Sequence, residues 1–368
     1  MKIAFLSTFY PFRGGIAQFN AGLYRALEKH HEVKAFNFSL QYPSLLFPGK
    51  TQLVNPEDNA DAIPSERTLS SISPRSFRTT AKAIEHFQPD LLIIGYWMPF
   101  MAPSLGYVAK RLAKKCKVVS IVHNAIPHER SRLDKVLSHY FFQRNTHFVA
   151  LSDAVRKDIL GNYPTAKVQT ILHPSYDHFG SLIPREEALN QLQLDPANRY
   201  LLFFGLIRDY KGLDKLLQAL PLLAPDIHLL IAGEVYGSFT VYQRIIQDHQ
   251  LETHVHQFNA YIPDHEVHLF FSAAECCVLP YKSATQSGIT AIAHHFNIPV
   301  VASDVGGLSE FIQHEKNGYL ISDCTYDKLA QWLNTGFSTG TFEKFRQTLS
   351  QQKHATWEDF SRELLKLI

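Results

Sequence analysis

Two cations lie in a short segment, GLIRDYKG at residues 205–212, which follows an expected strand at Tyr200–Phe204. Arg208 and Lys211 would then stand at the carboxyl edge of a parallel sheet. A lysine or an arginine in that position can hold phosphate oxygens through charge and hydrogen bonds. Loop cations are also commonly just solvated. The segment therefore indicates either a phosphate site or an ordinary exposed loop.

The stretch from Glu275 to Phe311 twice alternates a strand, a polar turn and the start of a helix. Its turns are Ser283–Gly288 and Gly306–Gly307, and they follow expected strands at Cys276–Leu279 and Pro299–Ala302. A helix N-terminus leaves backbone N–H groups free to bind an anion. Since the carboxyl ends of parallel strands meet at one edge, the pattern predicts a phosphate-bearing ligand there. The alternative is a capping turn without a ligand.

Two features of the first half of the chain could also contact a ligand. Gly14 and Gly15 form a turn after the first expected strand, where a plain turn is the alternative. The spacing G-x-G-x-x-G is missing, which argues against a dinucleotide site. His123 ends the expected strand KVVSIVH, where an imidazole can hydrogen-bond a ligand hydroxyl. Most of the 19 histidines must nevertheless be structural or exposed.

Strand and helix patterns alternate along the whole chain, which predicts an α/β fold with parallel sheets. The first half closes near His173-Pro174, and Ser39–Ser73 is expected to be a long excursion with weak structure. A second doubly wound half follows the polar segment Asp177–Arg199, and Ala355–Ile368 reads as an amphipathic helix. The expected strands are Lys2–Ser7, Glu32–Phe38, Asp90–Gly95, Lys117–Val122, His147–Leu151 and Val168–Leu172, then Tyr200–Phe204, His228–Ala232, Val255–Phe258, Cys276–Leu279 and Pro299–Ala302.

Composition describes an ordinary globular protein of two domains. The 368 residues are 45% hydrophobic and 19% charged, with a formal net charge of +2, so no nucleic-acid partner is indicated. The four cysteines form no C-x-x-C pair, which indicates reduced, buried thiols in a cytosolic protein. The start MKIAFLSTFYPF reads as a strand rather than a signal peptide, and no apolar stretch is long enough to span a bilayer.

Seven segments together resemble the family 4 (group 1) glycosyltransferases, in the order of that family and over nearly the whole chain. They are STFYPFRGGIAQF, VHNAIPHE, FFGLIRDYKGLDKLLQAL, LLIAGE, AECCVLPY, NIPVVASDVGGLSEFI with NGYLI after it, and TWEDFSRELL. The resemblance implies the GT-B fold, two Rossmann-like doubly wound domains facing a central cleft. Residues 1–175 would be the acceptor domain and 176–354 the nucleotide-sugar donor domain, with part of 355–368 packing back on the first.

The activity implied by the resemblance is retaining, metal-independent transfer of a sugar. The donor would be a UDP, GDP or dTDP sugar, and the acceptor a glycan or lipid-linked molecule in cell-surface polysaccharide or glycoconjugate synthesis. No cofactor is implied, and the location would be cytoplasmic, including the inner face of the membrane. Membrane-surface association is a further hypothesis, and it rests on a run of cations, Lys110, Arg111, Lys114, Lys115 and Lys117. The oligomeric state is not predicted.

The resemblance also assigns site residues by position. The catalytic set is His123, Arg208 and Lys211, although Arg208 lies three residues after the glycine where the family commonly has an arginine directly after it. Tyr261 and Glu129 would contact the base or the acceptor. The donor and phosphate site would comprise Gly14, Gly15, Gly205, Thr285, Gln286, Ser287, Gly288, Thr290 and Glu310.

One motif of the family is missing. Its members usually carry two glutamates eight positions apart before the Pro-Val-Val strand, and this chain has Ala284 and Ile292 there. The nearby hydroxyls and the Gln286 amide could bind sugar or phosphate instead. Two alternative functions therefore stay open. One is a binding partner protein that kept the fold and lost the chemistry, and the other is a sugar-nucleotide epimerase.

Overall fold

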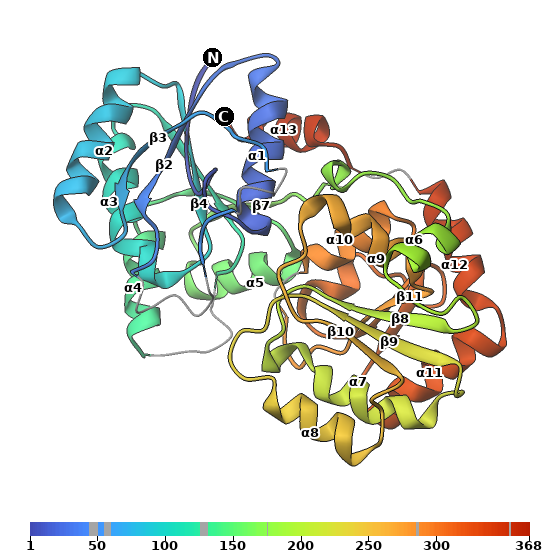
Figure 1. Ribbon diagram of the computed structural model, residues 1–368. Coiled ribbons are helices and arrows are strands. Elements are labelled where there is room, and N and C mark those ends of the chain that lie inside the picture. The colour runs from blue at the N-terminus through green and yellow to red at the C-terminus, as the bar shows by residue number, and fades with distance from the viewer. Residues whose placement is uncertain (44–50, 55–59, 126–131, 175, 285–286, 353–354) are drawn as a thin grey trace. The chain divides into compact units, whose positions relative to one another are not determined.

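The computed structural model describes residues 1–43, 51–54, 60–125, 132–174, 176–284, 287–352 and 355–368. Contacts divide the chain into two compact units (Figure 1). Unit 1 comprises Met1–Pro56, Ala60–Pro174 and Ala355–Ile368, and unit 2 contains Ser175–His354. Each unit is built around one sheet, and the roles of the two as acceptor and donor domains stay predictions.

Unit 1 contains a seven-stranded parallel sheet in the order β3-β2-β1-β4-β5-β6-β7. Helices α2 to α5 pack on one face, and α1 and α13 pack on the other. The strands are β1 (Lys2–Leu6), β2 (Glu32–Leu40), β3 (Ser65–Ser70), β4 (Leu91–Tyr96), β5 (Lys117–Val122), β6 (His147–Ala150) and β7 (Lys167–Thr170). The helices are α1 (Gly15–Glu28), α2 (Pro74–Phe87), α3 (Ala102–Leu112), α4 (Arg132–Phe142), α5 (Asp153–Asn162) and α13 (Trp357–Leu365).

Unit 2 contains a six-stranded parallel sheet in the order β10-β9-β8-β11-β12-β13. Helices α6, α9 and α10 cover one face, and α7, α8, α11 and α12 cover the other. The strands are β8 (Arg199–Phe204), β9 (Ile227–Ala232), β10 (Val255–Phe258), β11 (Cys276–Leu279), β12 (Val300–Ser303) and β13 (Gly318–Ile321). The helices are α6 (Arg185–Gln191), α7 (Leu213–Ala219), α8 (Thr240–Asp248), α9 (Val267–Ala273), α10 (Gly288–His295), α11 (Tyr326–Ser338) and α12 (Thr341–Gln351).

The central strands form as predicted because helices cover both faces of each sheet. Every residue of β4 and of β9 is buried, so these strands read as continuous apolar runs rather than as alternating patterns. The observed sheets confirm the α/β class and the two doubly wound halves. All four cysteines are free thiols, and of these Cys116 is half-buried and the other three are buried.

Four elements differ from the sequence prediction. The excursion expected over Ser39–Ser73 contains β3, which reads SERTLS and is polar because it is the edge strand of its sheet. The polar segment Asp177–Arg199 contains helix α6, and NGYLI supplies the further edge strand β13. The turn at Gly306-Gly307 opens only a five-residue 3₁₀-helix, Gly306–Glu310, rather than an α-helix.

The C-terminal helix α13 packs on α1 within unit 1. Trp357 lies against Gly22, where an added Cβ would come within 2.5 Å of the indole ring. Phe360 and Leu364 are buried on the same side. The helix begins with a capping box, in which Thr356 and Asp359 each accept a hydrogen bond from the backbone N–H of the other. Within the described ranges, no helix combines the length and apolar composition that a membrane span needs.

Candidate functional site

Most of the candidate residues follow the carboxyl ends of adjacent strands in unit 2. The order of the sheet reverses between β8 and β11, and ligands of open α/β sheets bind beyond the carboxyl ends at such a point. Two loops extend from this point, at residues 205–212 after β8 and at residues 280–284 and 287 after β11. We name these the β8 loop and the β11 loop. They carry the candidates with the most distinctive surroundings.

Lys211 is the most unusual of these residues because it is a buried lysine. Its exposed fraction is only 7%, and no carboxylate in the described part of the chain lies within salt-bridge distance of its ammonium group. Burial, together with the nearby Arg208 charge, lowers the pKa of Lys211 to about 8. Such a site favours an anionic ligand, which would supply the missing countercharge.

The neighbours of Lys211 fix where its ammonium group lies. An added Cβ at Gly205 would stand 3.2 Å from Lys211 Nζ, so the side chain passes directly over this glycine. On another side, Nζ lies 5.6 Å from the centroid of the Tyr281 ring. The ammonium group therefore lies close to a glycine and an aromatic ring, and neither of these neutralises its charge.

The β11 loop carries a hydroxyl group beside Tyr281, the aromatic neighbour of Lys211. Ser287 Oγ lies 3.4 Å from the hydroxyl of Tyr281, whose ring supports Lys211. Gly288 begins helix α10, so backbone N–H groups of its first turn point toward the loop. Thr290 is fully buried, and its hydroxyl donates a hydrogen bond to the Ser287 carbonyl. The hydroxyl is therefore already bonded at the start of the helix. Thr285 and Gln286 lie outside the described residues.

Arg208 lies in a loop pair that extends the sheet. Ile207 forms a parallel bridge with Val235, and its N–H donates to the carbonyl of Glu234. The guanidinium carbon of Arg208 lies 4.9 Å from the centroid of the Tyr236 ring. Arg208 is half-buried, so it remains accessible to a ligand while its position is fixed by stacking.

The two remaining candidates of unit 2 lie further along the same edge. Glu310 ends the 3₁₀-helix that follows β12 and is half-buried. Tyr261 follows β10 at the other end of the sheet and is also half-buried. Their roles at a base or a sugar stay predictions.

The positions of the two missing glutamates face different surroundings. Ile292 is 6% exposed and belongs to the apolar cluster between the sheet and α6, α9 and α10. Ala284 is half-buried and packs against the same cluster. At the second of these positions the Ile292 side chain is part of the core, and neither Ala284 nor Ile292 offers a carboxylate.

In unit 1, the glycine turn and His123 have contrasting environments. Gly14 caps helix α1 with a φ of 109°, and no atom of the described residues lies within 4 Å of where its Cβ would be. Gly15 is exposed. His123 is 3% exposed, its ring meets Phe19 edge-on at 4.9 Å, and its Nε2 has no hydrogen-bond partner among the described residues. Burial, with a smaller effect of His173, lowers its pKa to about 3, so the ring is neutral. Glu129 lies outside the described residues.

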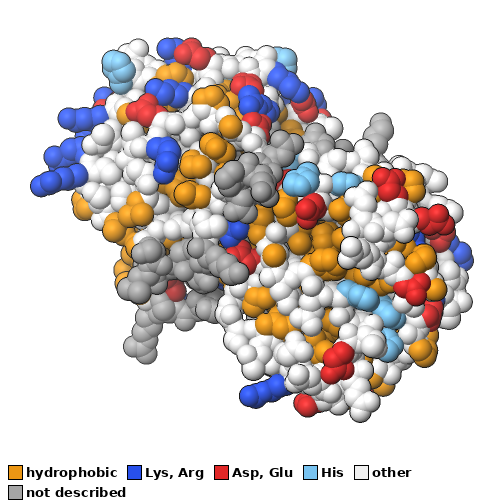
Figure 2. Space-filling model, in the orientation of Figure 1, with side chains coloured by type: hydrophobic (Ala, Val, Ile, Leu, Met, Phe, Trp, Pro, Cys, Tyr) orange, Lys and Arg blue, Asp and Glu red, His pale blue; other side chains and the backbone are white. Residues whose placement is uncertain are grey.

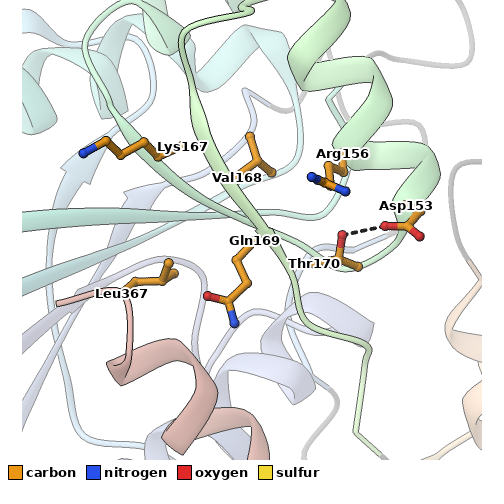
Figure 3. A pocket seen from close by; sticks show the side chains of 7 residues that line it. All are labelled: Asp153, Arg156, Lys167, Val168, Gln169, Thr170 and Leu367. Carbon is orange, nitrogen blue, oxygen red and sulfur yellow. Dashed lines mark hydrogen bonds between the residues drawn. The ribbon is translucent and has the colours of Figure 1, made fainter.

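A pocket of about 530 Å³ lies elsewhere, at the edge strand β7 of unit 1 (Figure 3). Arg156, Lys167 and Gln169 line it, together with Thr170, whose hydroxyl donates to Asp153. It includes none of the candidate residues. In the part of the chain that the structure describes, no group of three or more His, Cys, Asp or Glu side chains is arranged to hold a metal ion.

Sequence reasoning missed Tyr281 and Glu234. Tyr281 is 3% exposed and supports Lys211, but an aromatic residue after a strand gave no signal of that contact. Glu234 is 5% exposed and ends the segment LLIAGE, so the motif was noted while the carboxylate was not singled out. Its position after β9, beside the β8 loop, could have drawn attention to it.

Two family models match consecutive parts of the chain. Residues 13–175 match "Glycosyltransferase Family 4", and residues 184–353 match "Glycosyl transferases group 1". A D-inositol 3-phosphate glycosyltransferase of Pseudarthrobacter chlorophenolicus is 32% identical over 37% of this chain, and the match spans only 34% of that relative's length. An uncharacterized glycosyltransferase of Methanocaldococcus jannaschii is 22% identical over 98% of this chain and 95% of its own.

Solved structures share the fold along the whole chain. Anabaena HepE in complex with UDP is similar with a TM-score of 0.77 and 16% identity, covering 100% of this chain and 99% of its own. Sucrose-phosphate synthase from Thermosynechococcus elongatus gives a TM-score of 0.77 and 17% identity, covering 100% and 98%. At these identities the likeness establishes the fold alone.

Proposed function

The chain belongs to the family 4 (group 1) glycosyltransferases, and we propose that it transfers a sugar from a nucleoside diphosphate sugar to an acceptor. One observation supports this proposal most. Lys211 is buried where the order of its sheet reverses, near Arg208, and no carboxylate of the described residues lies within salt-bridge distance of it. A diphosphate bound there would supply that countercharge.

The proposed mechanism follows from the charge that develops on the leaving group. When the bond between the anomeric carbon and the diphosphate oxygen breaks, negative charge grows on the diphosphate. Lys211 and Arg208, with the N–H groups at the start of α10, would stabilise that charge without a metal ion. We propose retention of the anomeric configuration because the chain shares the motif series of the family. The acceptor would be a glycan or lipid-linked molecule of cell-surface polysaccharide or glycoconjugate synthesis on the cytoplasmic side.

Isothermal titration with UDP, GDP and dTDP tests the donor proposal. We expect one of the three to bind with a dissociation constant well below about 1 mM. UDP is the first compound to try, since the similar HepE structure contains it. A folded protein that binds none of the three would contradict the proposal.

We also propose that unit 1 associates with anionic membrane surfaces. Helices α2, α3 and α4 pack beside one another, and Lys and Arg side chains project from the surface near α2 and α3 (Figure 2). The exposed cations of this surface are Arg75, Arg78, Lys82, Lys110, Lys114, Lys115 and Lys135. On α4, Leu133 and Val136 are 64% and 65% exposed. Cations beside exposed apolar side chains are the features that bind such a surface.

Vesicle sedimentation checks the membrane proposal. We expect the protein to sediment with vesicles of phosphatidylglycerol and not with vesicles of phosphatidylcholine, and to detach at about 0.5 M salt because charge interactions are screened. A Lys114→Glu, Lys115→Glu double variant should bind anionic vesicles more weakly. Equal binding to both vesicle types would contradict this part of the account.

A second candidate function is a nucleotide-sugar-binding partner protein without catalysis. The absence of both carboxylates, with Ala284 and Ile292 in their places, favours it. Incubation with UDP, GDP and dTDP sugars separates the two. Hydrolysis or transfer that is lost in Lys211→Met would exclude the partner protein, whereas nucleotide binding without turnover of any sugar donor and acceptor tried would favour it.

A further inference from the structure

Lys282 joins the two loops that form the proposed diphosphate site. Its ammonium group lies 2.8 Å from Oδ1 of Asp209 and 3.2 Å from Oδ2 of Asp214. Asp209 precedes Lys211 by two residues and Asp214 follows it by three. One lysine of the β11 loop therefore holds the turn that carries Lys211 from both sides.

Backbone contacts also hold the β8 loop and the β11 loop against each other. The N–H of Lys282 donates to the Tyr210 carbonyl over 2.7 Å. Two residues earlier, the Pro280 carbonyl packs so closely on Gly212 that an added Cβ there would lie 2.0 Å from its oxygen. The Lys282 side chain thus reinforces a contact that runs along the whole Lys211 turn.

The two carboxylates keep Lys282 charged and paired; we name these two ion pairs, Lys282 with Asp209 and with Asp214, the clamp. Burial disfavours its charged form, but hydrogen bonds to Asp209 and Asp214 outweigh that effect, and the pKa of Lys282 is raised. Its side chain is 34% exposed, Asp214 is 26% exposed and Asp209 is 86% exposed. Exposed ion pairs add little to stability, so the clamp has its main consequence in the geometry of the turn.

We infer that Lys282 is a positioning residue for Lys211, which it holds in place through Asp209 and Asp214 without binding the diphosphate itself. This inference rests on the proposed function. A small displacement of a charged group from its ligand costs much of its effect on binding and rate. Lys282 would therefore set how well the β8 loop and the β11 loop can hold the two phosphates together.

The test compares UDP binding, or that of whichever nucleotide binds best, in Lys282→Met, Asp214→Asn and the double variant. We expect Lys282→Met to bind about tenfold more weakly. Asp214→Asn should also bind the nucleotide more weakly. The double variant should bind it no more weakly than Lys282→Met, because all three variants remove the same contact between Lys282 and Asp214. Lys282→Arg should restore binding. Lys34→Met is the matched control, since Lys34 pairs with Glu66 over 2.8 Å on β2 and β3 in unit 1.

A different pattern would overturn the inference. If Asp214→Asn bound the nucleotide as well as or better than the wild type while Lys282→Met lost affinity, Lys282 would be a direct phosphate ligand. The inference would also be overturned if the wild type bound the nucleotide and Lys282→Met bound it with the same affinity. Hydrogen exchange of the Lys211 and Gly212 amides, which donate to Arg208 and Asp209, should be faster in Lys282→Met without any ligand. A wild type that binds no nucleotide would instead contradict the proposed function, whatever the exchange shows.

Discussion

Lys211→Met is expected to lower kcat/KM for sugar transfer about 100-fold or more, because it removes the buried positive charge from the proposed diphosphate site. Folding should not suffer. Methionine keeps most of the apolar side chain, and no carboxylate within the described residues loses a salt-bridge partner. Nucleotide titration and thermal unfolding together check this prediction. Affinity should fall sharply, while the unfolding temperature stays the same or rises.

The pH dependence of stability gives the same prediction a second readout. Lys211 has a pKa of about 8 in the folded protein, below its usual value of 10.5. Between these two values the unfolded chain binds more protons than the folded one, so stability rises with pH. The wild type should therefore gain about 3 kcal/mol relative to Lys211→Met between pH 7 and pH 10.5. Lys34→Met serves as the control.

A Lys211→Met protein that binds the nucleotide normally would contradict the assignment of this lysine. So would a large loss of stability at pH 7, which would show that the charge has a structural countercharge in the folded protein. The two outcomes differ in meaning. The first rejects the site, and the second rejects the view that Lys211 is kept without a partner until a ligand binds.

Gly212→Ala is expected to destabilise unit 2 by about 3–5 kcal/mol. Gly212 has a φ of 71°, where an L side chain is strained by about 1–2 kcal/mol. The new Cβ would also lie 2.0 Å from the Pro280 carbonyl oxygen, so the β8 loop and the β11 loop would have to separate. Nucleotide binding should weaken for the same reason. Urea unfolding measures the loss of stability, followed by titration of the folded protein.

Gly340→Ala is the matched control for this prediction. Gly340 caps helix α12 with a φ of 65°, but no atom in the described part of the chain lies within 4 Å of its Cβ position. It should lose only about 1–2 kcal/mol from backbone strain. Equal losses in the two variants would show that strain alone matters and that the close contact with Pro280 does not hold the loops together.

The sequence predicts the central strands well because burial on both faces leaves unbroken apolar runs. Lys117–Val122 and Cys276–Leu279 are predicted with the bounds of the inner strands β5 and β11. The edge strand β3 is missed because its residues are polar. The edge strand β10, in contrast, is predicted with its observed bounds, Val255–Phe258. Helix α6 was missed since its charged first turn looks like a loop. Packing, and not local pattern, decides these elements.

The candidate site was only partly predictable. The sequence places Lys211 after a strand, but the burial that lowers its pKa and the nearby Tyr281 ring follow from no local pattern. Lys282 and Asp209 form an ion pair although they lie 73 positions apart in the sequence, and no spacing rule predicts that contact. Thr290 looked available from its type, whereas its hydroxyl is bonded within the first turn of α10.

A crystal structure with the bound nucleotide tests the central claim most directly. The account predicts that the diphosphate lies at the carboxyl edge of the β8–β11 strand pair, with a phosphate oxygen within about 3 Å of Lys211 Nζ. The same structure should show Lys282 still paired with Asp209 and Asp214. A diphosphate bound elsewhere in unit 2, or one that leaves Lys211 buried and out of reach, would contradict the account.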